Sequence, residues 1–140
     1  MKKRLLTLLF PLAALILEIL PYGAILKFAN PDGEPFRKTF SCFDLTPFGY
    51  ANFAPLITAL LTCIILFITA FYIATGNKKV AVALTIISTL TFAISLSPII
   101  FGEYSIVGAL ISLSLALGAC LFAVMIKKDN RKVANKSYTR

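Results

Sequence analysis

Histidine and tryptophan are both missing from this sequence of 140 residues. The lack of histidine removes the commonest general base and the commonest metal ligand in proteins. No P-loop, Gly-x-Ser-x-Gly or Cys-x-x-Cys motif takes its place. The sequence therefore does not favour an enzyme, and we expect no catalytic residue, no bound metal and no cofactor.

Cysteine is scarce, and its three copies are far apart in the sequence, at Cys42, Cys63 and Cys120. Cys42 lies in a polar connection, whereas the other two lie inside apolar segments. A membrane thiol oxidoreductase coupled to quinones needs paired redox cysteines, because electrons pass through a dithiol and a disulfide. This sequence has no such pair, so we exclude that class.

The sequence also has few charged residues of either sign, and its 6 acidic residues are fewer than its 14 lysines and arginines. Charged residues make up 14% of the chain, while a soluble domain carries about 25%. The hydrophobic fraction is 59% and the mean hydropathy is +0.87. The net charge of +8 comes from basic residues next to apolar segments and not from a basic stripe, so nucleic acid is not the expected partner. We expect a chain embedded in a lipid bilayer.

Four apolar segments occupy most of the chain, and Glu18 is the only charged residue inside them. They cover residues 5–26, 53–75, 80–100 and 106–126. Each is long enough to cross a hydrocarbon core of about 30 Å at about 1.5 Å per residue. The sequence thus predicts an all-α integral membrane protein, a four-helix transmembrane bundle over residues 1–126, followed by a basic cytoplasmic tail over 127–140.

Basic residues indicate the orientation of these spans. Eleven of the 14 lysines and arginines fall at the chain termini or between the second and third spans. The positive-inside rule then places both termini in the cytoplasm and the first and third connections outside. We expect a multi-pass protein of a plasma membrane, and its brevity suggests a bacterial one.

The N-terminus also has a second interpretation. A basic start at residues 2–4 and an apolar run from Leu5 resemble a secretory signal peptide. The run continues past Glu18 and no Ala-x-Ala follows it, which favours retention, although the sequence leaves cleavage open. Pro11 and Pro21 fall inside the first span, so we expect that helix to bend near residues 17–21.

The first outer connection, about residues 27–52, is the longest. Pro35 is suited to start a short helix, and Phe36, Phe40 and Phe43 follow at the spacing of one helical face. The sequence thus predicts a short amphipathic helix lying at the membrane interface, with Tyr50 at the same depth. The segment either caps the bundle or forms a surface for a ligand or partner.

Glu18 is the sharpest candidate for a functional side chain. A carboxylate inside a spanning helix costs about 2.5 to 3.5 kcal/mol at the helix centre, so it usually faces a bundle interior or an aqueous cavity. Ser88, Thr91 and Ser95 share a face of the third span and could line a polar path with it. These four residues form a candidate proton or ligand site. The alternative is a structural role, in which Glu18 and the hydroxyls only make hydrogen bonds between helices.

Small residues recur every four positions along the fourth span, at Gly108, Ser112, Ala116 and Cys120. Such a ridge lets two helix backbones approach closely and predicts a helix-packing surface. The pattern does not say whether the neighbouring helix belongs to the same chain or to a second copy.

The placement of Leu17-Glu18-Ile19 in a first span resembles that of small multidrug resistance transporters, which are four-span proteins with an essential glutamate in the first helix. That resemblance implies proton-coupled exchange in a homodimer, with Glu18 binding either a proton or a cationic substrate. It covers one residue in one helix. The family has a very brief first outer connection and tryptophan in its cavity, and this chain has neither.

Two functional expectations follow. The first is a non-enzymatic accessory, immunity-like or envelope-associated membrane protein that acts through helix contacts and its outer loop, with a partner that the sequence does not identify. The second is a proton-coupled small-molecule transporter that uses Glu18 and works as a homodimer. The lipid bilayer is an expected partner in both.

Overall fold

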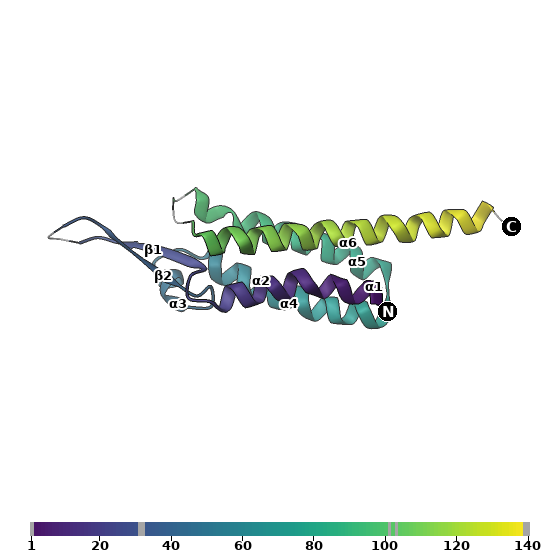
Figure 1. The fold of residues 1–140 in the computed structure, drawn as a ribbon, viewed down its shortest axis with the longest axis horizontal. Helices are drawn as coiled ribbons and strands as arrows, with labels where there is room; N and C mark the ends of the chain where they lie inside the picture. The colour runs from purple at the N-terminus through teal and green to yellow at the C-terminus, as the bar shows by residue number, and fades with distance from the viewer. Residues whose placement is uncertain (1, 31–32, 101, 103, 139–140) are drawn as a thin grey trace.

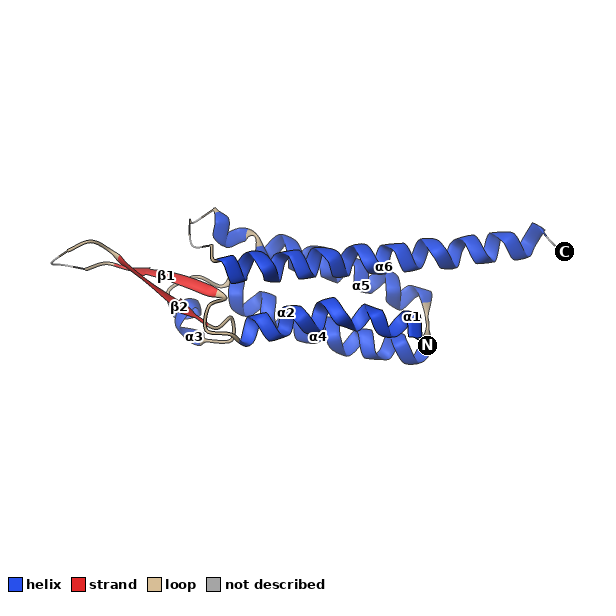
Figure 2. Cartoon of the chain, viewed as in Figure 1, coloured by secondary structure: helices blue, strands red, loops and turns tan. Residues whose placement is uncertain are grey.

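The computed structural model describes residues 2–30, 33–100, 102 and 104–138, which form an elongated helical bundle with a β-hairpin at one end (Figure 1). Helices account for most of the described chain, and the two strands lie next to each other at that end (Figure 2). The elements in chain order are α1 (Lys2–Leu5), η1 (Leu6–Leu8), α2 (Leu9–Ile19), β1 (Ala24–Phe28), β2 (Phe36–Phe40), α3 (Leu45–Gly49), α4 (Ala54–Thr75), α5 (Lys78–Ser95), η2 (Ser97–Ile99) and α6 (Ile106–Tyr138).

Three of the four predicted spans are confirmed as helices that are long and apolar enough to cross a membrane. They are Ala54–Thr75, Lys78–Ile99 and Ile106–Lys128. The last is part of α6, which continues as one helix to Tyr138, beyond the predicted end of the span at residue 126. The final residues of the predicted tail, 139–140, lie outside the described residues.

The turn between the second and third of these helices shows why they end where they do. Gly76 closes α4 in the left-handed conformation, with φ of 64°, and its N–H bonds to the Tyr72 carbonyl over 2.8 Å. Asn77 then starts α5, because its side chain accepts a hydrogen bond from the Lys79 N–H over 3.0 Å. The two-residue connection forces α4 and α5 to run antiparallel.

The first predicted span is wrong in its length. Its apolar helix ends at Ile19 and not near residue 26, and the helical stretch Leu6–Ile19 is shorter than the three spans above. Leu20 is extended, with ψ of 143°, as expected for a residue that precedes proline. Pro21 therefore ends the helix instead of bending it. Among the described residues, three helices and not four meet the length for a membrane span.

The predicted amphipathic helix in the first outer connection is also wrong, because residues 36–40 form strand β2. This strand pairs with β1 in an antiparallel hairpin, with Phe28 opposite Phe36 and Ala24 opposite Phe40. Side chains four residues apart share a face in a strand as well as in a helix, so the spacing of Phe36 and Phe40 fits both. Phe43 follows the strand and packs against the bundle core.

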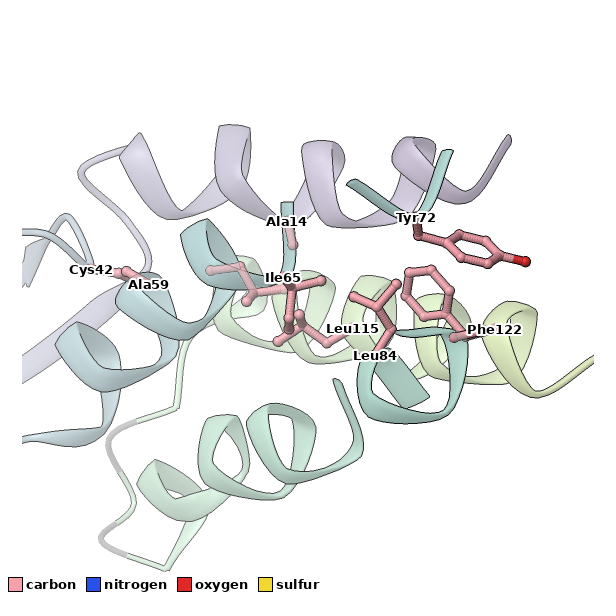
Figure 3. Packing of buried hydrophobic residues seen from close by; sticks show 10 residues of the cluster. Ala14, Cys42, Ala59, Ile65, Tyr72, Leu84, Leu115 and Phe122 are labelled. Atoms are coloured by element: carbon pink, nitrogen blue, oxygen red, sulfur yellow. The ribbon is translucent and has the colours of Figure 1, made fainter. Parts of the chain in front are cut away.

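The three long helices and the shorter α2 pack around one core. α6 contacts both α2 and α5, and α4 contacts α5 and α2. Buried side chains from all four meet along the bundle axis, as Figure 3 shows for Ala14, Ile65, Leu84, Leu115 and Phe122. The start of α1 and the C-terminal end of α6 lie at the end of the bundle opposite the hairpin (Figure 1). We call these the hairpin end and the termini end.

Candidate functional site

Glu18 lies in the last turn of α2 with its side chain completely buried. Thr62 of α4 donates a hydrogen bond from its hydroxyl to Glu18 Oε1 over 2.8 Å. The same hydroxyl lies 3.0 Å from the Thr58 carbonyl oxygen one turn earlier on α4. Thr62 is roughly 12 Å along α4 from its start at Ala54. Because Thr62 contacts Glu18, the Glu18 side chain lies about the same distance inside the bundle from the hairpin end.

The second carboxyl oxygen of Glu18, Oε2, is buried without a hydrogen-bond partner in the described residues. A carboxylate has about four acceptor positions, and a protonated carboxyl has one donor and its remaining acceptors. One hydrogen bond from Thr62 therefore leaves most of this capacity unused. A buried polar atom without a partner costs about 1 to 3 kcal/mol, so Glu18 is poised to accept a proton or a further polar partner.

The backbone around Glu18 joins helix α2 to the segment after the hairpin. Because α2 stops before Pro21, the carbonyl groups of its last turn have no helical partners. The Glu18 carbonyl accepts hydrogen bonds from the Cys42 N–H over 3.0 Å and from the Ser41 hydroxyl over 2.9 Å. The return of the hairpin thus caps α2 at the residue that carries the buried carboxyl group.

The hydroxyls of α5 that the sequence singled out make other contacts. Thr91 donates to the Ile87 carbonyl of its own helix over 2.8 Å, and Ser95 bonds to Ser112 of α6 over 2.8 Å. Ser88 is buried and its hydroxyl has no partner in the described residues. The hydroxyl that bonds to Glu18 comes from α4 instead. Sequence reasoning missed Thr62, although Thr58, Thr62 and Thr69 share the buried face of α4 at helical intervals of four and seven residues.

A second polar cluster joins α5 and α6 near the hairpin end. The Tyr104 hydroxyl donates to Ser112 Oγ over 2.9 Å, next to the Ser95–Ser112 bond. Ser105 also donates to the Gly23 carbonyl over 3.3 Å, which fixes the chain just before β1. Tyr104 was not among the predicted site residues, because no motif or periodic spacing in the sequence distinguishes a single tyrosine beside a turn.

A cavity of about 20 Å³ lies between these two clusters. Its lining includes Cys42, Thr58, Ser95 and Tyr104. A cavity needs about 10 to 15 Å³ to hold a water molecule, and the site must also offer polar partners. This cavity meets both conditions, and Glu18 is not among the residues that line it.

Cys42 is buried beside this cavity. Burial, and to a smaller extent the charge of Glu18, raise the pKa of the Cys42 thiol to about 12. The thiol is therefore protonated at neutral pH and behaves as a small apolar side chain. All three cysteines are free, and no cluster of three potential metal ligands occurs in the described part of the chain.

The small-residue ridge of the fourth span packs partly inside the chain. Ser112 contacts α5 through Ser95, and Gly108 lies against the Gly23 carbonyl, where an added methyl group would be 3.4 Å away. Ala116 is half-buried, and Cys120 is exposed. The hairpin half of the ridge is thus an internal packing surface. Gly118, two residues beyond Ala116 and therefore on another side of α6, is buried against Phe10 of α2, a contact that the four-residue pattern did not reveal.

An aromatic cluster covers one face of the hairpin. Phe28 stacks on Phe36 with ring centroids 5.3 Å apart and meets Tyr50 edge-on at 5.3 Å. Phe40 lies 6.4 Å from Phe28, and the Lys38 ammonium stands 5.5 Å from the Phe40 ring centre. Phe36 and Tyr50 are more than half exposed. The sequence identified Phe36, Phe40 and Tyr50 but not Phe28, which joins them only once β1 and β2 pair.

Comparison with known proteins gives no relative from which to transfer a role. No protein-family model, no curated protein and no solved structure matches the sequence. The assignment of function must therefore rest on the geometry described above.

Proposed function

We propose that this chain is a non-enzymatic accessory protein of a plasma membrane, whose hairpin binds another protein on the outer side. The observation that carries this proposal is the hairpin itself. It projects from the helical bundle at the end opposite the termini (Figure 2), and Phe36 and Tyr50 of its aromatic cluster are more than half exposed. Aromatic residues are enriched at protein interfaces, where they supply large contact areas at low entropic cost.

The base of the hairpin is held firmly, as a binding element requires. Ala24 and Leu26 of β1 are buried, and Gly23 is bonded to Ser105 at the start of α6. Strand β2 ends at Phe40, and Ser41 and Cys42, which follow it, cap α2. A loop fixed at both ends loses less conformational entropy when a partner binds. The positive-inside rule supports an outward position for it, since most basic residues lie at the termini end.

Position-specific photo-crosslinking in native membranes tests this role. A photoreactive amino acid replaces Phe36 on the exposed aromatic face, and a matched variant carries it at Lys79, which is exposed at the termini end. We expect a discrete adduct with a different protein only from position 36. Equal adducts from both positions, or no adduct from position 36, would contradict the proposal. A self-adduct of twice the chain mass would favour the second candidate below.

The second candidate is a proton-coupled transporter that works as a homodimer. One observation favours it: Glu18 is completely buried and its Oε2 atom has no partner in the described residues. Buried ionisable groups in membrane segments often mark proton pathways. Proteoliposomes that contain a pH-sensitive dye, exposed to a panel of small organic cations, would report such coupling. Proton movement that Glu18→Gln abolishes would support transport, and its absence across the panel would leave the accessory role.

A further inference from the structure

A groove of about 630 Å³ lies at the hairpin end between the start of α4 and the end of α5. Its size falls within the range of about 300 to 1,000 Å³ that is typical of ligand sites. Ile57 of α4 and Ile94 of α5 form its apolar walls, and Phe53 and Tyr50 close it toward α3. Glu18 and the hairpin strands do not line this groove, and Tyr50 is the one lining residue that also belongs to the aromatic cluster of the hairpin.

The residues around the groove indicate which kind of ligand it can bind. Its walls belong to two helices that are long and apolar enough to cross a membrane, and Ile57 is 39% exposed. Such faces meet lipid hydrocarbon when the helices lie in a bilayer. The side chains with polar groups in the lining are Tyr50 and Asn52, which come before α4, and Ser97, which follows α5. The groove is therefore apolar along the helices and polar where they end. A phospholipid in one leaflet has the same arrangement, with apolar acyl chains in the membrane and a polar headgroup at its surface.

The walls are also held in place by contacts that do not involve the bilayer. The Phe53 ring packs edge-on against Phe48 of α3 at 4.8 Å, and the Tyr50 ring packs against Phe28 of the hairpin at 5.3 Å. Between them, Ala51 lines the groove with φ of 63°, and it has the one positive φ among the described residues other than glycine. Backbone strain of this kind costs about 1 to 3 kcal/mol and often occurs at binding sites.

We propose that this groove binds one acyl chain of a phospholipid from the leaflet on the hairpin side, with the glycerol-phosphate region beside Asn52 and Ser97. The lipid completes the surface between α4 and α5 at the level where the helices leave the hydrocarbon. It also lies against Tyr50, so the bound chain supports the aromatic cluster of the hairpin.

Single-tryptophan variants test this proposal cleanly, because the natural sequence contains no tryptophan. Phe53→Trp places a fluorophore in the groove, and Phe67→Trp is its matched control on the lipid-facing side of α4, where Phe67 is 81% exposed. Each full-length variant is loaded with phospholipid that has brominated chains, which quench tryptophan, and is then moved into unlabelled detergent. We expect the Phe53→Trp signal to remain quenched and the Phe67→Trp signal to recover.

A groove-filling substitution provides the second arm. Ile94→Phe in the Phe53→Trp background should lower the retained lipid about tenfold, which equals 1.4 kcal/mol of binding free energy. Ile86→Phe, at an exposed position of α5 eight residues before Ile94, should leave the amount of retained lipid unchanged. If Phe53→Trp does not fold, Phe48→Trp replaces it, because the two rings are in contact.

The proposal would be overturned if quenching recovered equally in the groove and control variants, or if Ile94→Phe and Ile86→Phe behaved alike. It would also be overturned if native mass spectrometry showed the groove covered by a second copy, as a dimer without bound phospholipid. None of these outcomes depends on the partner of the hairpin, so the lipid site and the proposed function fail or succeed separately.

Discussion

The two halves of the bundle differ in the hydrogen bonds that some of their buried hydroxyl groups make. In the half near the termini, Thr7 and Thr69 are buried, and each hydroxyl bonds to a carbonyl of its own helical segment. In the half near the hairpin, Thr62 and Ser112 bond across helices, to Glu18 and to Ser95. The first half gains stability from apolar packing, and the second uses polar contacts to fix how its elements meet. This contrast supports our proposal that the hairpin end carries the function.

The largest side chains of the core lie in the termini half, so truncation there should have the strongest effect. Phe122 of α6 is completely buried beside Leu84 and Tyr72 (Figure 3). We expect Phe122→Ala to lower the free energy of unfolding by about 3 to 5 kcal/mol, through lost burial and the cavity left behind. Unfolding in detergent measures it, with Val124→Ala on the exposed face of α6 as the control. Equal stability of the two variants would contradict this division of the bundle.

A change on the ridge of α6 should have a smaller but specific effect. Ser112→Ile adds bulk where α6 approaches α5 and removes the bonds to Ser95 and Tyr104. Overpacking usually costs about 1 to 3 kcal/mol. Leu113→Ile, at a half-exposed neighbouring position, should be mild. If both variants melt at the same temperature in detergent, the ridge is not the internal contact described here.

Substitutions of Glu18 separate its hydrogen bond from its charge. Glu18→Gln keeps an acceptor for the Thr62 hydroxyl, so we expect almost no change in stability. Glu18→Leu removes that acceptor, although Thr62 keeps its contact with the Thr58 carbonyl, and we expect a loss of about 1 kcal/mol. Thermal unfolding in one detergent compares them. A large loss in Glu18→Gln would show that the charge itself holds the bundle together.

The smallest effect expected is a pH dependence at Asp44, the N-cap of α3 outside the spanning helices. Hydrogen bonds from Thr46, including its N–H at 2.8 Å, hold the pKa of the Asp44 carboxyl below its ordinary value of 3.8. A carboxyl group whose pKa is lowered by folding stabilises the folded state at pH values above its ordinary pKa. This stabilisation is lost as the pH falls through the pKa of the folded state. The stability difference between the natural chain and Asp44→Asn should therefore shrink in acid. A difference that is constant with pH would contradict the cap.

The sequence predicted the three long spans because uninterrupted apolar runs are read directly from residues 53–75, 80–100 and 106–126. The length of the first span was predicted wrongly because a proline such as Pro21 can either bend a helix or end it. Here the helix ends, because Leu20, the residue before the proline, adopts an extended conformation. The hairpin was misjudged for a related reason. Phe36 and Phe40 share a face in both a helix and a strand, and only pairing with residues 24–28 distinguishes the two.

The candidate site was predictable only in part. A charged residue in an apolar run is conspicuous, so Glu18 was found from the sequence. Thr62 was not, because threonine is common in spanning helices and α4 meets α2 only in the folded chain. The groove between α4 and α5 could not be predicted either, since it depends on where Tyr50 and Phe53 are placed by α3.

The orientation of the hairpin is the claim on which the account depends most. Labelling of intact cells with a membrane-impermeant maleimide tests it, in a background where Cys42, Cys63 and Cys120 are replaced by alanine. Phe36→Cys on the hairpin and Lys79→Cys at the termini end provide matched exposed positions. We predict that Phe36→Cys is labelled in intact cells and that Lys79→Cys is labelled only after the membrane is permeabilised. Labelling of Lys79→Cys but not of Phe36→Cys in intact cells would contradict the account.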